Sequence, residues 1–341
     1  MDNYEGVRQP LDAKPPHLEK NNVNYFINIK DLEAFRRAAA PRIEGIEGDQ
    51  VIVSSTPEGD NFYYDLWNKV NEDDANIPDY LKEWINLIKL QRQQEQNIKP
   101  LPITVGILSW ASHSTLRNTL QSYKDNGLFE AVQEVIIFFQ EVSETDLAIA
   151  EEFGITNIIS SETNIGIGPA IVSLVEQARC PYVLFLEMDW KLIEPAHTVK
   201  TILNAAVNLI DQGVTDFYRL RSQSNYGWPL FTAQFQGREL DSPEHLIEQV
   251  HFLGRSLADK FPDLIKYTDQ FNTGTVYGDS RYCNYSNNPF ICKKEFYLNH
   301  VAPADKGGIS LEGEIRKVWQ EAGHKVGYNT IGLFKHERLD R

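Results

Sequence analysis

Two carboxylate side chains, Glu187 and Asp189, are separated by a single residue and directly follow PYVLFL, the strongest predicted strand of the chain. Carboxylate oxygens are hard ligands, so carboxylates at a strand end can hold Mg²⁺ or Mn²⁺. A cation held there would neutralise negative charge that develops on a leaving group. Isolated acidic pairs of this kind also occur in ordinary solvated turns, so the surrounding elements decide the interpretation.

A glycine-containing turn precedes this strand, with Asn164, Gly166 and Gly168 at the start of an apolar helix. Glycine allows the backbone to approach a ribose or phosphate closely and to enter a helix tightly. The dinucleotide fingerprint G-x-G-x-x-G is not met, because Ile171 occupies the third glycine position and no acidic residue follows a second strand at the expected distance. The sequence therefore argues against a dehydrogenase.

Strands and helices alternate after Pro102. Buried strands are predicted at 103–110, 132–141, 155–161 and 181–190, and helices at 114–127, 145–154 and 168–180. Ser114 is the expected N-cap of the first of these helices, and Gly127 marks its end. This alternation predicts an α/β fold with a mostly parallel sheet and helices on both faces. Ligands bind beyond the carboxyl ends of the strands in such sheets, and the polar segments fall there.

The first hundred residues have a different pattern. Residues 1–22 are predicted to form a disordered arm, followed by short strands at 22–29 and 51–56 and an amphipathic helix at 79–96. The helix ends in a polar linker, and no catalytic pattern precedes it. We interpret residues 1–100 as an N-terminal α/β extension with a packing or positioning role, and residues 101–341 as a second domain.

The composition limits the partners. The chain of 341 residues has a formal net charge of -15, which disfavours nucleic acid or an anionic membrane surface as a partner. The mean hydropathy is -0.39, and neither a transmembrane segment nor a secretory signal is recognisable, so a cytoplasmic protein is expected. The three cysteines show no zinc-type spacing, and their odd number argues against a disulfide framework, although Cys283 and Cys292 could pair.

The order of elements from Asn164 to Trp190 carries a family resemblance. Asn-x-Gly, a helix, an apolar strand and an acidic pair follow one another, as in the nucleotide-binding half of family-two glycosyltransferases, which have the GT-A fold. The segment from about 101 to 341 resembles these enzymes. The resemblance implies a Rossmann-like nucleotide-sugar half at 101–215 and an acceptor half at 216–341. It implies sugar transfer from a nucleotide-sugar, UDP-linked by expectation, to a glycan or glycoconjugate, with Mn²⁺ or Mg²⁺ as cofactor.

The same resemblance assigns roles to individual residues. Asp189 would be a metal ligand, and Glu187, where the family has Asp, would face the ribose or support the metal indirectly. Glu141 would contact the base, with Gln140 in place of a second acidic residue. The Asn164, Gly166 and Gly168 turn would bind the nucleotide-sugar. His336, near the chain end, would close the metal site.

A general base is expected on the helix that begins near residue 311. Counting back from Ala322-Gly323-His324, Glu312 falls at the acidic position that the family uses as base. An inverting transfer needs a base that takes the proton of the acceptor hydroxyl as its oxygen attacks the anomeric carbon. Glu314 ranks second, because two residues further along a helix a side chain points elsewhere. A first-turn carboxylate could also serve only the helix dipole.

The segment from 216 to about 290 is rich in aromatic residues and includes a predicted helix at 242–261 with Ser242 as its cap. Rings that could face a sugar are Tyr226, Trp228 and Phe231, and cations that could contact a phosphate or a sugar carboxylate are Arg219, Arg221 and Arg281. Such aromatic residues are usually core residues, so this acceptor region is assigned by position only.

Three alternatives accompany the inverting glycosyltransferase. A retaining enzyme on the same fold stays open, because the stereochemistry depends on where the base lies. A domain that binds a nucleotide-sugar or glycan without turnover is suggested by Glu187 and Gln140, whereas Asp189 and Glu312 argue for catalysis. A sugar-1-phosphate nucleotidyltransferase would have a glycine-rich loop with Arg or Lys after the first strand, where this chain has SWASHST.

Overall fold

The computed structural model describes residues 25–28, 51–54, 99–235, 246, 255–307 and 311–340. The chain divides into two compact units, Met1–Ile98 and Lys99–Arg341. In the first unit, β1 (Tyr25–Asn28) and β2 (Val51–Ser54) pair in parallel, within the two segments where short strands are predicted. The predicted arm at 1–22, the amphipathic helix at 79–96 and most of the helix at 242–261 lie outside the described residues.

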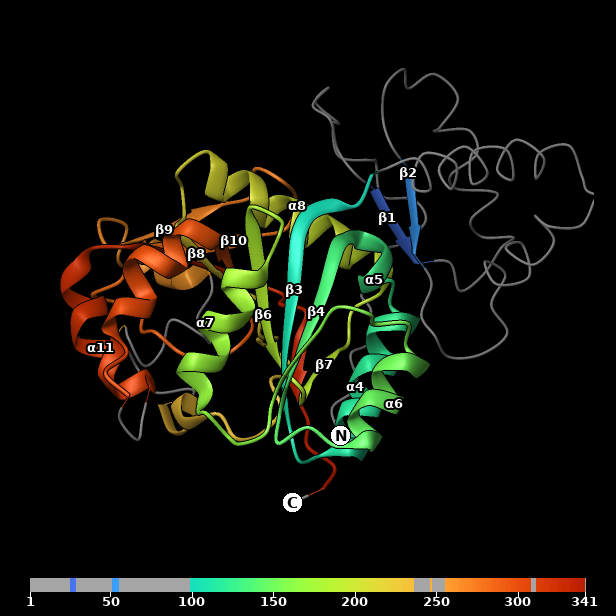
Figure 1. The fold of residues 1–341 in the computed structure, drawn as a ribbon. Helices are drawn as coiled ribbons and strands as arrows, with labels where there is room; N and C mark the ends of the chain where they lie inside the picture. Colours follow the sequence, from blue (N-terminus) through green and yellow to red (C-terminus); the bar gives the residue numbers. More distant parts are fainter. Residues whose placement is uncertain are drawn as a thin grey trace, which may run out of the picture. The chain divides into compact units, whose positions relative to one another are not determined.

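The second unit is built on a nine-stranded sheet (Figure 1). Its first four strands are mutually parallel and run in the order β5 (Ile158–Ser161), β4 (Val132–Gln140), β3 (Leu101–Trp110) and β6 (Tyr182–Glu187). The rest of the sheet is mixed and continues through β11 (Phe290–Lys293), β8 (Phe217–Arg219), β12 (Lys325–Asn329), β10 (Thr275–Asp279) and β9 (Ile265–Thr268). The predicted α/β architecture, with a parallel group of strands, is confirmed, but the parallel strands are concentrated in the first half of the sheet.

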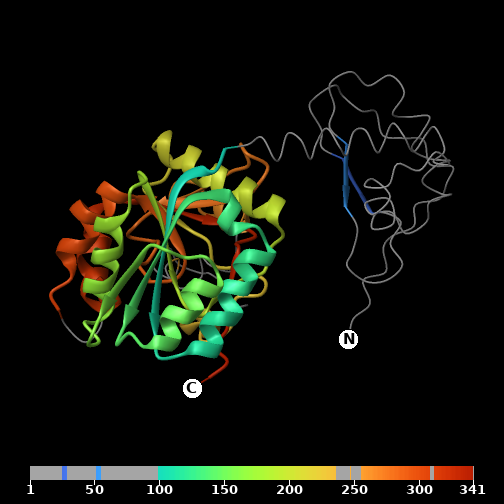
Figure 2. The ribbon, with the colours of Figure 1, turned by 45° about the vertical axis from the view of Figure 1, so that its right-hand side comes forward.

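Helices cover both faces of this sheet (Figure 2). One face carries α4 (His113–Asp125), α5 (Leu128–Ala131), α6 (Glu144–Glu152) and α8 (Ala196–Asp211), and the other carries α7 (Ile167–Gln177) and α11 (Leu311–Ala322). A short α10 (Lys294–Phe296) follows β11. No helix in the described residues is long and apolar enough to cross a bilayer.

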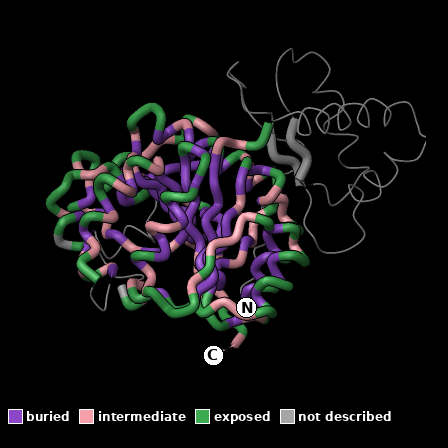
Figure 3. Tube along the Cα trace, in the orientation of Figure 1, coloured by how far each residue is buried: buried purple, intermediate pink, exposed green. Residues whose placement is uncertain are grey.

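Two hydrophobic cores follow from the alternation of side chains along the strands. In β3, Ile103, Val105 and Ile107 belong to the core beneath α4 and α8, whereas Leu108 belongs to the core beneath α7 and α11. Successive residues of a strand point to opposite faces, so an almost uninterrupted apolar run can fill both cores. Figure 3 shows these central strands as buried along nearly their whole length. The buried strands provide a rigid support for the polar residues at their ends.

The N-cap predicted for the first helix of this unit is wrong. Helix α4 begins at His113, one residue before Ser114, and its cap residue Ser112 makes no side-chain cap bond. The hydroxyl groups of Ser112 and Ser114 instead donate to the carboxylate of Asp340, and Thr115 Oγ1 does so at 2.5 Å. A carboxylate accepts stronger hydrogen bonds than a neutral group. Gly127 follows the helix end as predicted, with a left-handed φ of 68°.

The three cysteines are free and buried, so Cys283 and Cys292 do not form the disulfide that the sequence left open. Both lie in the core beneath α7 and α11. Burial raises the pKa of the Cys283 thiol to about 12, which keeps it protonated and unreactive at neutral pH.

A buried carboxylate, Glu134 of β4, ties several elements of the parallel half together. It accepts hydrogen bonds from Thr104 Oγ1 of β3 (2.6 Å) and from Asn157 Nδ2 before β5 (3.1 Å). It also accepts from the backbone N–H (2.8 Å) and Nε (2.5 Å) of Arg179, between α7 and β6. Burial alone would raise the pKa of Glu134, but the hydrogen bonds from Thr104 and Arg179 outweigh burial, and its pKa is lowered.

Replacing this carboxylate should destabilise the second unit. We expect Glu134→Ala to lower the free energy of unfolding by about 2–4 kcal/mol, because it leaves buried donors without an acceptor. Urea unfolding followed by circular dichroism measures the effect, and Glu151→Ala, at an exposed position of α6, is the control. Because the folded pKa is lowered, the difference between wild type and variant should shrink as the pH falls through the titration of Glu134. An unfolding midpoint equal to that of the control would contradict this role.

Candidate active site

The carboxyl end of β6 meets the C-terminal strand of the chain. The predicted strand at 181–190 ends at Glu187, a turn contains Asp189, and a second short strand, β7 (Trp190–Leu192), follows. Strand β13 (Phe334–His336) pairs antiparallel with β7 and sets His336 opposite Trp190. The backbone N–H of Glu337 then donates to the carbonyl of Asp189 at 2.8 Å. Backbone pairing therefore determines where the turn that contains Asp189, called the acidic turn below, lies relative to His336.

Asp189 and His336 are in direct contact, although they are far apart in the sequence. Asp189 Oδ2 lies 3.1 Å from His336 Nε2, and both side chains are largely buried. His336 Nδ1 contacts the backbone carbonyl of Trp228, so an N–H at this position donates to that oxygen and Nε2 faces the carboxylate. The ring of Trp190 lies 4.8 Å from the His336 ring and limits its rotation. The imidazole is thus oriented from two sides.

This pair fits a divalent cation. Asp189 Oδ1 is buried and has no hydrogen-bond partner among the described residues, so a carboxylate lone pair is unused. A neutral His336 that donates through Nδ1 presents its Nε2 lone pair to the same place, the arrangement typical of metal-bound histidines. Adjacent ligands of an octahedral ion with bonds of about 2.1 Å lie about 3 Å apart, close to the 3.1 Å between Nε2 and Oδ2.

The protein alone supplies only part of a coordination shell. In the described part of the chain, no group of three His, Cys, Asp or Glu side chains is placed to hold a metal ion. Mg²⁺ commonly binds through one or two protein ligands and completes its shell with water and substrate phosphate. The donors therefore suit a cation that binds together with a phosphate-bearing ligand.

Glu187 is partly buried at the end of β6 and lies near two other carboxylates. Burial raises its pKa to about 8, and the negative charges of Asp189 and Glu312 add to the shift, whereas Arg338 opposes it. The carboxyl group is therefore mostly protonated at neutral pH when no cation is bound. In this form it can donate a hydrogen bond to a ligand hydroxyl or phosphate.

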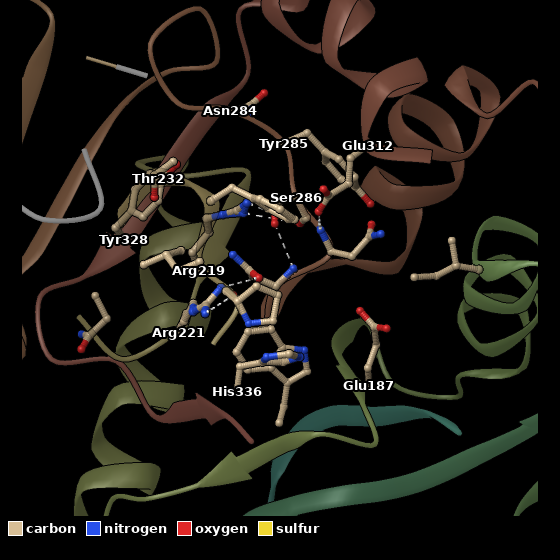
Figure 4. A pocket seen from close by; sticks show the side chains of 18 residues that line it. Glu187, Arg219, Arg221, Thr232, Asn284, Tyr285, Ser286, Glu312, Tyr328 and His336 are labelled. Atoms are coloured by element: carbon tan, nitrogen blue, oxygen red, sulfur yellow. Dashed lines mark hydrogen bonds between the residues drawn. The ribbon is translucent and has the colours of Figure 1, made fainter. Parts of the chain in front are cut away.

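A cavity of about 380 Å³ opens beside these residues (Figure 4). Glu187 and His336 line one side, and Arg219, Glu312 and Tyr328 line others. The remaining lining residues come from the segment after β8 and the segment before β11, together with single residues from elsewhere; they are Ile167, Trp190, Arg221, Pro229, Leu230, Phe231, Thr232, Asn284, Tyr285, Ser286, Asn287, Asn288 and Asn329. The volume is at the lower end of the range for small-molecule sites.

The structure distinguishes Glu312 from Glu314. Glu312 Oε1 accepts a hydrogen bond from the backbone N–H of Asn287 at 2.7 Å, and its side chain lines the cavity. Glu314 Oε2 accepts from the backbone N–H of Lys306 at 2.6 Å, and Glu314 does not line the cavity. Glu312 is therefore the carboxylate of α11 that can meet a ligand there.

The glycine-containing turn before α7 is organised by side chains. Asn164 Oδ1 accepts from the N–H of Gly166 at 2.9 Å, and Gln140 Oε1 accepts from the N–H of Ile165 at 2.8 Å. Gly166 has φ 87°, which favours glycine. A Cβ on Gly168 would lie 1.9 Å from Asp305 Oδ2, so close packing gives a structural reason for this glycine. Gln140, which is buried, thus supports the backbone of this turn.

Glu141 lies just after β4 and is exposed. Its Oε2 accepts a hydrogen bond from Trp110 Nε1, at the end of β3, at 2.7 Å. Glu141, Asn164, Gly166 and Gly168 do not line the cavity, although Ile167 of the same turn does. Glu187, Glu312 and His336 line it, and Asp189 adjoins it through His336. Asn164, Gly166 and Gly168 follow β5, so they lie with Glu141 beyond the carboxyl ends of the parallel strands.

The arginine and aromatic candidates separate in the structure. Arg219 and Arg221 are buried and line the cavity, whereas Arg281 is exposed, pairs with Asp279 and lies outside it. Phe231 is 81% exposed and reaches the cavity rim, but Tyr226 and Trp228 do not line it. Sequence reasoning missed the polar run 284–288 as cavity lining. The sequence feature that could have indicated this lining is the cluster of Asn and Ser residues shortly before the apolar strand β11.

The fold and the site together define an α/β protein in which the turn that contains Asp189, the histidine His336 and the helix carboxylate Glu312 meet around one cavity. No protein-family description matches the sequence, and no curated protein sequence matches it. Among solved structures, S. aureus TarS 1–349 is 15% identical with a TM-score of 0.43, over 70% of this chain and 60% of that one.

TarS 1–349 in complex with UDP is 14% identical with a TM-score of 0.42, again over 70% and 60% of the two chains. A mycobacterial protein is 15% identical with a TM-score of 0.42, over 70% of this chain and 67% of the other. The chain therefore matches about three fifths of TarS 1–349. Similarities of this degree do not bear on what the present chain binds.

The raised pKa of Glu187 makes stability depend on pH. Between its ordinary value of 4.5 and the folded value of about 8, the folded state holds a proton that the unfolded state releases. The free energy of unfolding of the wild type should therefore fall as the pH rises through this range. The fall should exceed that of Glu187→Gln by on the order of a few kcal/mol, because the variant has no group that titrates at this position. Urea unfolding between pH 5 and 8 in the presence of a chelator measures the difference.

Glu176→Gln, at an exposed position of α7, is the matched control and should follow the wild-type pH profile. Parallel profiles for wild type and Glu187→Gln would show that Glu187 titrates normally and that its neighbours do not shift it.

Proposed function

We propose that residues 99–341 form a metal-dependent glycosyltransferase that moves a sugar from a nucleotide-sugar, UDP-linked by preference, to a glycan or glycoconjugate, with inversion at the anomeric carbon. One arrangement carries the proposal. Glu312 lines the cavity, and the Asp189–His336 pair adjoins the same cavity. Leaving-group stabilisation and proton removal are the two tasks that such a transfer requires. The resemblance of 164–190 to family-two glycosyltransferases supports the same interpretation.

Asp189 and His336 would hold Mn²⁺ or Mg²⁺ together with the diphosphate of the donor. The cation supplies positive charge where the diphosphate oxygen becomes negative as its bond to the sugar breaks. Glu187, next to this pair, would hydrogen-bond the ribose or the diphosphate. Glu141 and the Asn164–Gly168 turn would contact the base and ribose beyond the parallel strands.

Glu312 would act as the general base. The N–H of Asn287 holds its Oε1 at 2.7 Å, so the carboxylate has a defined orientation toward the cavity. The acceptor hydroxyl loses its proton to Glu312 as its oxygen bonds to the anomeric carbon, and the bond from that carbon to the diphosphate breaks. A retaining transfer would give the opposite anomer, and a domain that only binds would give no product, so product analysis separates these alternatives.

The metal assignment predicts a defined change in thermal stability. With Mn²⁺ present, UDP at about 100 times its dissociation constant should stabilise the folded state by about 2.7 kcal/mol, a rise in Tm of several degrees. We expect chelator to remove most of this rise in wild type, and Asp189→Ala to show a small rise that does not respond to chelator. Differential scanning fluorimetry measures both.

Asp263→Ala, at an exposed position, is the control and should behave as wild type. A rise in Tm for Asp189→Ala that equals the wild-type rise and still depends on Mn²⁺ would refute the assignment of Asp189.

The base assignment predicts different effects for two neighbouring carboxylates. We expect Glu312→Gln to lower turnover by about two to four orders of magnitude with UDP affinity within a fewfold of wild type. Glu314→Gln should lower turnover by less than about tenfold, because the Glu314 side chain accepts a hydrogen bond from the backbone N–H of Lys306 outside the cavity. Hydrolysis of a panel of UDP-sugars gives the rates, and calorimetry gives the affinities. Equal loss in both variants, or the reverse order, would refute Glu312 as the base.

A further inference from the structure

Arg219, at the end of β8, is a buried cation whose hydrogen-bonding capacity is mostly unused. Arg219 is only 6% exposed, and its Nε has no hydrogen-bond partner in the described part of the chain. Nη1 and Nη2 both reach the Ser286 carbonyl, at the long distance of 3.4 Å. The rings of Phe217 and Tyr328 lie 5.8 Å and 5.6 Å from the guanidinium carbon and hold it in place.

The two other arginines that the sequence offered as candidates, Arg221 and Arg281, do not share this property. Arg221 donates to backbone carbonyls of the 226–229 segment at 2.8–3.0 Å and to Asn288 Oδ1 at 3.1 Å. Its guanidinium group is therefore already used in holding this segment in place. Burial and the nearby charge of Arg219 lower the pKa of Arg221 to about 10. Arg281 is exposed and engaged with Asp279. Arg219 is therefore the arginine of the three that a ligand can engage.

Other polar atoms around the cavity also have no partner. Thr232 Oγ1, Asn284 Oδ1 and Asn287 Oδ1 are buried and unbonded within the described residues, and all three residues line the cavity with Arg219 (Figure 4). Buried polar groups are almost always hydrogen-bonded in native proteins. Several such groups around one cavity indicate a ligand that carries several oxygen and hydroxyl groups.

We propose that Arg219 is a specificity-determining residue that binds an anionic oxygen group, a carboxylate or a phosphate, on a sugar held in this cavity. A guanidinium keeps its charge when buried, and burying it without a counter-charge is costly. Nε–H and one Nη–H form a fork that matches two oxygens of a carboxylate or phosphate. This inference rests on the proposed function for the sugar, and the anionic group is distinct from the donor diphosphate assigned to Asp189 and His336.

Matched pairs of probes test the proposal by calorimetry in Mn²⁺. For the donor, the affinity of UDP-glucuronate is compared with that of UDP-glucose. For the acceptor, the affinities of glucuronate and of glucose 1-phosphate are each compared with that of glucose, using protein saturated with UDP. Wild type should bind the charged member of the donor pair or of an acceptor pair about ten- to hundredfold more tightly than the neutral member. Whichever pair shows the preference identifies the substrate that carries the charge.

Arg219→Gln should remove this preference and leave UDP affinity within about twofold of wild type, whereas Arg219→Lys should keep part of the preference. Arg281→Gln is the control and should match wild type. Equal binding of both members of every pair, or a preference that persists in Arg219→Gln, would overturn the proposal. A tenfold loss of UDP affinity in Arg219→Gln would also overturn it, because Arg219 would then serve the diphosphate.

The proposed function can fail separately. If UDP with Mn²⁺ does not bind wild type at all, the nucleotide assignment is refuted. The role of Arg219 is then tested by comparing the affinities of glucose 1-phosphate and glucose for the free protein. A preference for glucose 1-phosphate that Arg219→Gln abolishes would support the role, and the absence of a preference would contradict it.

Discussion

The contact between Asp189 and His336 is the interaction on which the rest of the site depends. The acidic turn ends the parallel half of the sheet, and the histidine arrives from the last strand of the chain. The residues after that strand hold it in place: Glu337 forms ion pairs with Lys191 and Lys335, and Asp340 accepts from three hydroxyl groups around the start of α4. Those hydrogen bonds from Lys335 and Lys191 lower the pKa of Glu337 to about 2. The C-terminal segment is thereby a structural part of the site.

The charges around the cavity are arranged so that no one sign dominates it. Burial raises the pKa of Glu187 to about 8, and the negative charges of Asp189 and Glu312 add to this shift. Arg219 and Arg221 line the same cavity, and the charge of Arg219 adds to burial in lowering the pKa of Arg221. A cation beside the carboxylates and an anionic group beside Arg219 would relieve both kinds of repulsion. The proposed ligand, with cation-bound phosphate at one end and a further acidic group elsewhere, would supply both.

Local patterns predicted the parallel half of the fold well, because the apolar runs of its strands and the apolar spacing of its helices are encoded by neighbouring residues. The strand 103–110 appears as β3, and the helix 168–180 as α7. The failures came from contacts between distant segments. Ser114 does not cap its helix because Asp340, from the chain end, binds it. The predicted strand 181–190 breaks at the acidic turn because β7 pairs with β13 instead of continuing the main sheet. Glu187, Glu312 and His336 could be named from the sequence, but the cavity that they share could not, nor could the difference between Arg219 and Arg221.

The most direct test of the account is pulsed electron paramagnetic resonance of Mn²⁺ bound to the full chain with UDP, using protein labelled with ¹⁵N-histidine. The chain has eight histidines, so the identity of the ligand needs a variant. The account predicts phosphorus couplings from the diphosphate and a coupling to one histidine nitrogen, which disappears in His336→Gln. Phosphorus couplings without any histidine nitrogen in wild type, or a nitrogen coupling that persists in His336→Gln, would contradict it.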